Sequence, residues 1–305
     1  MGDTAPTMTL SPQRPVVLLP PLGALAQQLT AQYRTELERS LGKGVTSTAP
    51  CDGIAEQLFW AVTGQLGQPP VAQAMARKCE LPVPMQSDGV WLQPVLMATG
   101  MSDVTIHACP NDCSIPDQYA DELIRSADTL GIQLQRAGKL GFLAVAEPGR
   151  VTHFTAPDMA MEQSLLDAMP SGDGAGVWHQ LINESQVLAR HHNVQGFNSL
   201  WPWGQGRWPG GSAAQGPAGE AIDPTLTALL DMLSANNGEP GIYCLAGIDG
   251  KLLVEESVLA QHVAAAIKSR GSVIFADGPQ VRFDRWSFWR RKTLPLIDLR
   301  EYRCR

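Results

Sequence analysis

The densest group of side chains that could do chemistry lies in one segment, INESQVLARHHNVQGFNSLWPWGQGRWP, from Ile182 to Pro209. Its pattern predicts the end of a helix followed by a loop rich in Gly and Trp. Glycines there would let backbone N–H groups approach a ligand closely, and such backbone concavities favour anions. The residues that we predict to bind a ligand are Asn183, Glu184, His192, Asn193, Asn198, Trp201, Trp203, Gly204, Gln205, Gly206 and Arg207.

The same segment also has a purely structural interpretation. A tight turn whose Trp side chains seal a domain junction would contain the same residues, because large aromatic rings bury much apolar surface. Spacing alone favours this structural interpretation over a ligand site.

A second group consists of His107, Cys109 and Cys113, in the pattern H-x-C-x3-C after a predicted strand. Imidazole and thiolate ligands suit Zn(II) or Cu(I). Only three ligands are present, and incidental Cys in a loop is the alternative. The six Cys of the chain are scattered, which is typical of reduced thiols rather than of a disulfide scaffold, so we expect a cytoplasmic protein.

A third group is the basic and aromatic C-terminal run. From Arg282 to Arg305 there are eight Lys or Arg and three acids, a local charge of +5, which leaves −12 on the rest of a chain of net charge −7. Such a run could contact a protein partner or lie peripherally on an anionic membrane, or it could dock onto its own acidic chain. The predicted partner surface is Arg285, Trp286, Trp289, Arg290 and Arg291.

The overall charge and hydropathy exclude two further classes. An acidic chain with a pI of about 5.4 does not suit a nucleic-acid binder, whose affinity rests on neutralising phosphates. No run of about eighteen apolar residues is present, so we expect no transmembrane segment.

The elements that would position these groups alternate between strands and helices. A buried strand at Pro15–Leu19 precedes a helix over Leu22–Leu41, and a hairpin joins strands at Trp91–Met97 and Asp103–Cys109. An amphipathic helix is predicted at Asp117–Gly131, and a further helix at Val177–Arg190. This pattern predicts an α/β fold with a mixed sheet flanked by helices.

Composition also predicts a division of the chain. Residues 1–14 are expected to be a disordered N-terminus, and residues 15–208 to form the main α/β body with the Trp-rich loop at its end. A flexible linker would follow at 209–221, and residues 222–305 would form a C-terminal α/β part with the basic tail.

The segment FNSLWPWGQG resembles the Asn-x-x-Trp-x-Trp-Gly-x-Gly signature of bacterial cofactor-independent phosphoglycerate mutases, of the alkaline-phosphatase-like superfamily. A closer resemblance is to the shorter RpfE-type regulatory, or phosphoglycerate-mutase-like, proteins. The matching segments run in order from about residue 89 to 297, whereas the first 88 residues match poorly. They are GVWLQPVLMATGMSDVTIHA, DQYADELIRSADTLG, INESQVL, FNSLWPWGQG and VRFDRWSFWRRKTLPL. The resemblance implies a reduced alkaline-phosphatase-like architecture and a small phosphorylated ligand.

The sequence departs from the catalytic pattern of the mutases. The resemblance implies two metals held by several Asp and His, and an Asp-Gly after the first strand, but Pro20, Pro21 and Leu22 stand there instead. No His follows His262, and Gly278 follows Asp277. We therefore expect no catalytic residues and no cofactor, and a regulatory or accessory protein that acts by binding a protein partner or ligand.

Two alternatives stay open. The first is a phosphoglycerate-mutase-type isomerase with an atypical metal site, which would use Zn or Mn and the residues Asp52, Asp88, Asp277, His191 and His192. The second is a metal- or redox-handling protein that uses Cys109 and Cys113, with Zn or Cu as the metal.

Overall fold

A computed structural model describes most of the chain between residues 15 and 283. The described ranges are 15–42, 44–48, 53–63, 65–81, 89–99, 104–109, 113–146, 152–161, 164–206, 219–233, 241–249, 251–276 and 279–283. The chain divides into two compact units. Unit 1 comprises Met1–Gly67 and Gly210–Arg305, and unit 2 comprises Gln68–Pro209.

The boundary between Pro209 and Gly210 falls at the start of the predicted linker, whereas the boundary between Gly67 and Gln68 lies within the predicted 15–208 body. The physical reason is that the first strand pairs in parallel with two strands from the last third of the chain, and unit 2 is inserted between them. The predicted disordered N-terminus, 1–14, lies outside the described residues, as does most of the predicted linker. The last three linker residues, 219–221, form a strand.

Unit 1 is built on a six-stranded mixed sheet with the order β2-β11-β10-β1-β9-β8. Its strands are β1 (Val16–Leu19), β2 (Val45–Thr48), β8 (Gly219–Ala221), β9 (Ile242–Cys244), β10 (Ser272–Phe275) and β11 (Pro279–Arg282). β1 is parallel to β9 and β10, whereas β11 is antiparallel to β10 and β2. The central β1 is buried along its whole length, which explains its continuous apolar run, VVLL.

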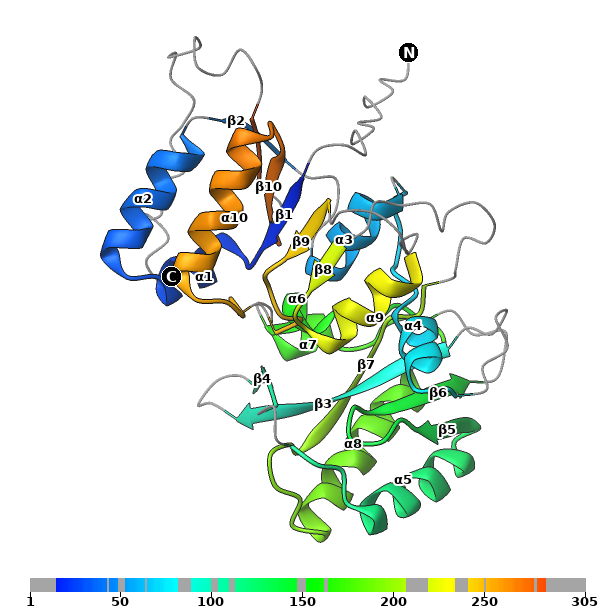
Figure 1. The fold of residues 1–305 in the computed structure, drawn as a ribbon. Helices are drawn as coiled ribbons and strands as arrows, with labels where there is room; N and C mark the ends of the chain where they lie inside the picture. The colour runs from blue at the N-terminus through cyan, green and yellow to red at the C-terminus, as the bar shows by residue number, and fades with distance from the viewer. Residues whose placement is uncertain are drawn as a thin grey trace. The chain divides into compact units, whose positions relative to one another are not determined.

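Helices cover the sheet of unit 1 (Figure 1). They are α1 (Leu22–Gln28), α2 (Ala31–Leu41), α3 (Ile54–Thr63), α9 (Pro224–Leu233) and α10 (Glu256–Lys268). Val17 and Leu19 of β1 share a core cluster with Leu37 of α2 and Leu259 of α10. Because side chains alternate along a strand, the other face of β1 is left for α3, which packs against β1, β9 and α9.

The single helix predicted over Leu22–Leu41 is wrong, because α1 and α2 are separate helices. Leu29 and Thr30 between them have extended backbones, and the amide and hydroxyl of Thr30 both donate hydrogen bonds to the carboxylate of Glu256. This tertiary contact with α10 is not visible in the local pattern.

Unit 2 contains an antiparallel sheet of five strands, in which β3 pairs with β4, β6 and β7, and β6 pairs with β5. The strands are β3 (Gly89–Thr99), β4 (Val104–Ala108), β5 (Ile132–Arg136), β6 (Phe142–Ala146) and β7 (Ser199–Trp203). The predicted β3–β4 hairpin is confirmed. The overall class is confirmed too, since this is a mixed α/β fold with sheets flanked by helices.

The helices of unit 2 are α4 (Val71–Lys78), α5 (Asp117–Thr129), α6 (Pro157–Met161), α7 (Leu165–Ala168) and α8 (Ala175–His191). α5 and α8 pack against each other beside the sheet (Figure 1). Their apolar faces, with Tyr119 and Leu123 on α5 and Trp178 and Leu181 on α8, form one core with Phe142 of β6. Both helices agree closely with the sequence-based prediction.

No helix in the described part of the chain combines the length and the apolar character needed to cross a bilayer.

The β5–β6 hairpin offers a test of this packing. A Cβ at Gly141 would lie 2.9 Å from Cζ2 of Trp91 and closer still to the carbonyl oxygen of Leu92, at a φ of +145°. We expect Gly141→Ala to lower the free energy of unfolding by about 3 kcal/mol, because strain and overpacking add together. Chemical denaturation measures this.

Gly138→Ala is the matched control in the same hairpin. Gly138 also has a positive φ, +58°, but a Cβ there would meet nothing within 4 Å. It should cost only about 1 kcal/mol, the penalty of a left-handed backbone. Equal losses for the two variants would contradict the packing around Trp91.

Candidate ligand site at the end of helix α8

The predicted binding segment begins within α8 and continues through a tight turn. The N–H of Val194 donates to the carbonyl of Ala189 (2.9 Å), and that of Asn193 to the carbonyl of Arg190 (3.2 Å). Asn193 itself has a φ of +48°. These are the two bonds and the left-handed residue of a Schellman motif, in which Asn is accepted in place of Gly. The turn redirects the chain from α8 towards β7.

The Trp-rich stretch after this turn is a strand and not a loop, so that part of the prediction is wrong. All five residues of β7 are buried, and Trp201 and Trp203 are 0% and 1% exposed. The indole N–H of Trp201 donates to the carbonyl of Thr155 (2.8 Å), and that of Trp203 to Oε1 of Gln93 (3.1 Å). A strand that is buried on both faces does not alternate polar and apolar residues. Without that alternation, the sequence gives no signal that separates such a strand from a Trp-rich loop.

The two glycines after β7 approach protein backbone rather than an open cradle. A Cβ at Gly204 would lie 2.6 Å from Cβ of Val71, and its carbonyl accepts the N–H of Ala72 (3.0 Å). A Cβ at Gly206 would overlap the carbonyl of Gln68. These glycines therefore let the chain pass close to the start of α4. Gln205 is half-buried between them, and Arg207 lies outside the described residues.

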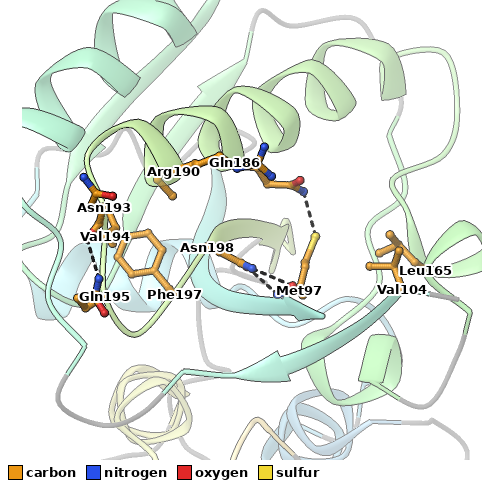
Figure 2. Close-up of a pocket in the computed structure, with 11 residues that line it drawn as sticks. Met97, Val104, Leu165, Gln186, Arg190, Asn193, Val194, Gln195, Phe197 and Asn198 are labelled. Carbon is orange, nitrogen blue, oxygen red and sulfur yellow. Dashed lines mark hydrogen bonds between the residues drawn. The ribbon is translucent and has the colours of Figure 1, made fainter. Parts of the chain in front are cut away.

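A pocket of about 480 Å³ opens beside the end of α8 (Figure 2). It brings together two of the predicted residues, Asn193 and Asn198, with Arg190 of the same helix end. Asn183 and Glu184, which lie earlier on α8, do not line it, and neither does His192. The full lining is Met97, Val104, Leu165, Gln186, Ala189, Arg190, Asn193, Val194, Gln195, Phe197 and Asn198.

The amides of this pocket hold its wall in place. Oδ1 of Asn198 accepts the N–H of Met97 (2.7 Å), and its Nδ2 donates to the carbonyl of Met97 (2.8 Å), so this side chain continues the strand pairing of β3 (Figure 2). Nε2 of Gln186 lies 3.1 Å from Sδ of the same Met97. In contrast, the guanidinium of Arg190 has no ion pair or hydrogen bond to another described residue.

Ser185 is a residue that the sequence did not single out. It is fully buried on α8, and its hydroxyl both donates to the carbonyl of Ile182 (2.6 Å) and accepts the N–H of Leu200 (3.1 Å). It therefore joins α8 to β7 directly. A Ser between the more polar Asn183 and Gln186 gives no local signal of that role.

On its α5 side, the end of α8 carries a group of potential ligands. Nε2 of His192 donates to Oε2 of Glu122 (2.9 Å), and the rings of His191 and His192 are 5.0 Å apart. The hydrogen bond from His192 holds the pKa of the Glu122 carboxyl below its usual range. Two of the five ligands named for the isomerase alternative thus lie beside an unpredicted carboxylate. Asp52, Asp88 and Asp277 lie outside the described residues.

Of the predicted group His107, Cys109 and Cys113, the structure shows an interaction only between the two Cys. A hydrogen bond between the thiols of Cys109 and Cys113, together with burial, raises the pKa of Cys109. Both side chains also pack against the core under α5 and α8. His107 is exposed on β4, where its Nε2 and Oγ1 of Thr105 are 3.0 Å apart.

In unit 1, the carboxyl ends of the parallel strands are where an α/β sheet usually binds ligands. Among the described residues, β1 is followed by the buried Pro20 and Pro21, and β10 by the buried Ala276. Asp223 follows β8, but its Oδ1 accepts the N–H groups of Thr225 (2.8 Å) and Leu226 (3.2 Å), and caps α9. Its Oδ2 accepts the N–H of Ile248 (3.1 Å). The predicted surface at Arg285, Trp286, Trp289, Arg290 and Arg291 lies outside the described residues.

Comparisons with known proteins give distant structural similarities. No family model and no curated protein matches the chain. A cofactor-independent phosphoglycerate mutase from Thermoplasma acidophilum is 12% identical with a TM-score of 0.35, and covers 89% of this chain and 89% of its own. The PH0037 protein from Pyrococcus horikoshii is 9% identical with a TM-score of 0.36, and covers 90% of this chain and 88% of its own. Similarity at this level says nothing about the activity of this chain.

The burial of β7 can be tested at Trp201. Trp201→Phe removes the hydrogen bond to Thr155 and leaves a small void, so we expect a loss of about 2 kcal/mol in the free energy of unfolding. Trp178→Phe is the control, because Trp178 is buried but its indole makes no hydrogen bond to a described residue. If Trp201→Phe were as stable as the native chain, the interior position of Trp201 would be wrong.

Asp223 tests whether the carboxylate after β8 serves structure. Asp223→Ala removes three hydrogen bonds, and we expect it to cost about 1–2 kcal/mol in the free energy of unfolding, as for other helix caps. Asp231→Ala, at an exposed position on α9, should be close to neutral. If Asp223→Ala left the free energy of unfolding unchanged, the structural role of this carboxylate would be wrong.

Proposed function

We propose that this chain is a non-catalytic, phosphoglycerate-mutase-like protein of the RpfE type, with a regulatory or accessory role, which binds a small anionic ligand. The binding site is the pocket beside the end of α8. The observation that carries this proposal is the guanidinium of Arg190, which lines a 480 Å³ pocket and has no ion pair to another described residue.

The chemistry of the pocket suits a small phosphorylated or carboxylated metabolite. A guanidinium presents two parallel N–H donors that match the oxygens of a phosphate or carboxylate. Gln195 also lines the pocket, with its Nε2 donating to the carbonyl of Asn193 (3.0 Å), while Phe197 and Leu165 offer apolar surface to a carbon skeleton. A volume of about 480 Å³ falls within the range of small-molecule sites.

The non-catalytic part of the proposal is supported by the ends of β1 and β8 in unit 1. Phosphoryl transfer of the mutase type depends on two metals to stabilise charge, and these need several carboxylates or imidazoles at one place. Among the described residues, Pro20 and Pro21 follow β1, and the carboxylate after β8 is engaged by three backbone N–H groups. Asp277, which follows Ala276 after β10, lies outside the described residues. A protein partner bound by the basic tail is also part of the proposal, on the strength of its +5 charge.

The test is titration of the full chain with 3-phosphoglycerate, and separately with inorganic phosphate, followed by amide chemical shifts. We expect shifts at the end of α8, and Arg190→Gln should weaken binding about ten- to hundredfold through the loss of charged hydrogen bonds. Arg77→Gln, at an exposed position on α4, is the matched control and should bind as the native chain does.

Two results would overturn the proposal. Binding that is unaltered by Arg190→Gln, or no shifts in this pocket with either anion, would remove the ligand site. Conversion of 3-phosphoglycerate into 2-phosphoglycerate by the purified chain with added Mn²⁺ would remove the non-catalytic assignment.

A further inference from the structure

Three side chains with metal-binding atoms converge where α5 meets the end of α8. One atom each from Glu122, His191 and His192 lies within 4.8 Å of the other two. Nε2 of His192 and Oε2 of Glu122 are the closest pair, at 2.9 Å. The group belongs to unit 2 and lies outside the pocket beside Asn198, whose lining contains none of the three residues.

The fold fixes the backbones of these three residues. His191 is the last residue of α8 and His192 is its cap, and the Schellman turn at Asn193 fixes both backbones. Glu122 precedes Leu123, which is fully buried in the core shared by the two helices. Ligands on packed helices are positioned more accurately than ligands on loops, so the site is largely prepared before any ion arrives.

The electrostatics of this place favour a cation. The last carbonyls of a helix carry partial negative charge, and a positive ion near them is stabilised. The Glu122 carboxylate adds a full negative charge. Nη2 of Arg125 competes for that carboxylate from 4.0 Å, but this side chain is 74% exposed and can turn towards solvent.

We propose that Glu122, His191 and His192 form a binding site for Zn²⁺ or a similar transition-metal ion. Two imidazole nitrogens and one carboxylate oxygen are a donor set that suits Zn²⁺, and three protein ligands leave a fourth position for water or an external ligand. With Zn–N and Zn–O bonds of about 2.0–2.2 Å, ligand atoms of a tetrahedral site lie about 3.4 Å apart. The widest separation here, up to 4.8 Å, closes when the exposed ring of His191 turns inward.

Metal binding would replace one hydrogen bond by three metal–ligand bonds. The hydrogen bond between His192 and Glu122 is replaced by a bond from each side chain to the metal, and His191 supplies the third. Each imidazole binds in its neutral form, so a protonated ring releases its proton. The bound ion then links α5 to α8, and it stabilises unit 2 increasingly as the free ion concentration rises.

This proposal does not rest on the proposed function, since neither Arg190 nor the anion pocket takes part in it. It also differs from the Cys alternative, because thiolates have no place in the ligand set. Experiments can therefore separate this metal site from the anion pocket and from the Cys alternative.

The experiment is a calorimetric titration of the metal-free full chain with Zn²⁺, on a Cys109→Ser/Cys113→Ser background that removes the thiols of the alternative site. We expect one equivalent to bind. Glu122→Gln and His192→Ala should each weaken binding at least about tenfold, since even changes to residues around a ligand cost ten- to hundredfold. His153→Ala removes an exposed histidine elsewhere in unit 2 and should leave the affinity unchanged.

A spectroscopic readout on the native chain needs no substitution in the site. Co²⁺ should give the absorption of nitrogen and oxygen ligands without thiolate charge-transfer bands, and should shift the ring resonances of His191 and His192. The proposal fails if Zn²⁺ does not bind the Ser/Ser background, or if Glu122→Gln and His192→Ala bind as tightly as that background. It also fails if Co²⁺ leaves both rings unshifted.

Discussion

The turn that ends α8 is the constraint on which both candidate sites depend. Two backbone hydrogen bonds close it, and Asn193 takes the left-handed conformation that allows the chain to leave the helix sharply. On one side of this turn, Arg190 and Asn193 line the pocket. On the other side, His191 and His192 face Glu122 of α5. Loss of the turn would disperse both groups together.

The position of β7, the next element after the turn, is fixed by burial. β7 is inserted against the central strand β3 and packs against α8, with the hydroxyl of Ser185 joining helix to strand. Asn198 pairs with both backbone groups of Met97 just before β7 begins. These polar contacts give the apolar interior a single register, because a shift would leave buried N–H and C=O groups unpaired. The same hydrogen bonds that fix β7 against β3 therefore also position Asn198 and Met97 in the pocket wall.

The two sites share one helix end, so an ion on one side and an anion on the other would act on the same element. Because the turn at Asn193 already fixes this helix end, neither proposed ligand would need to order its backbone. In unit 1, by comparison, the polar group at a strand end is used within the fold, since Asp223 caps α9 and ties it to Ile248.

The sequence by itself determined the local elements of this protein. The amphipathic period of α5, the helix α8, the apolar run of β1 and the β3–β4 hairpin were all predictable, because each depends on side chains a few residues apart. It also pointed to the region of the two candidate sites, including Asn193, Asn198 and both histidines. It could not place Trp201 and Trp203 in the interior, since a wholly buried strand and a Trp-rich turn look alike in one sequence.

Only the tertiary structure decided the rest, for one physical reason: the deciding contacts join residues far apart in the chain. β1 pairs with β10 across more than two hundred residues, so the segments on either side of unit 2 form one unit. Composition marked the boundary near residue 209 as a linker but gave no boundary after Gly67. α1 and α2 are separated by a contact from Glu256. Glu122 looks like any solvent-facing acid of α5, and only the packing of α5 on α8 brings it to His192.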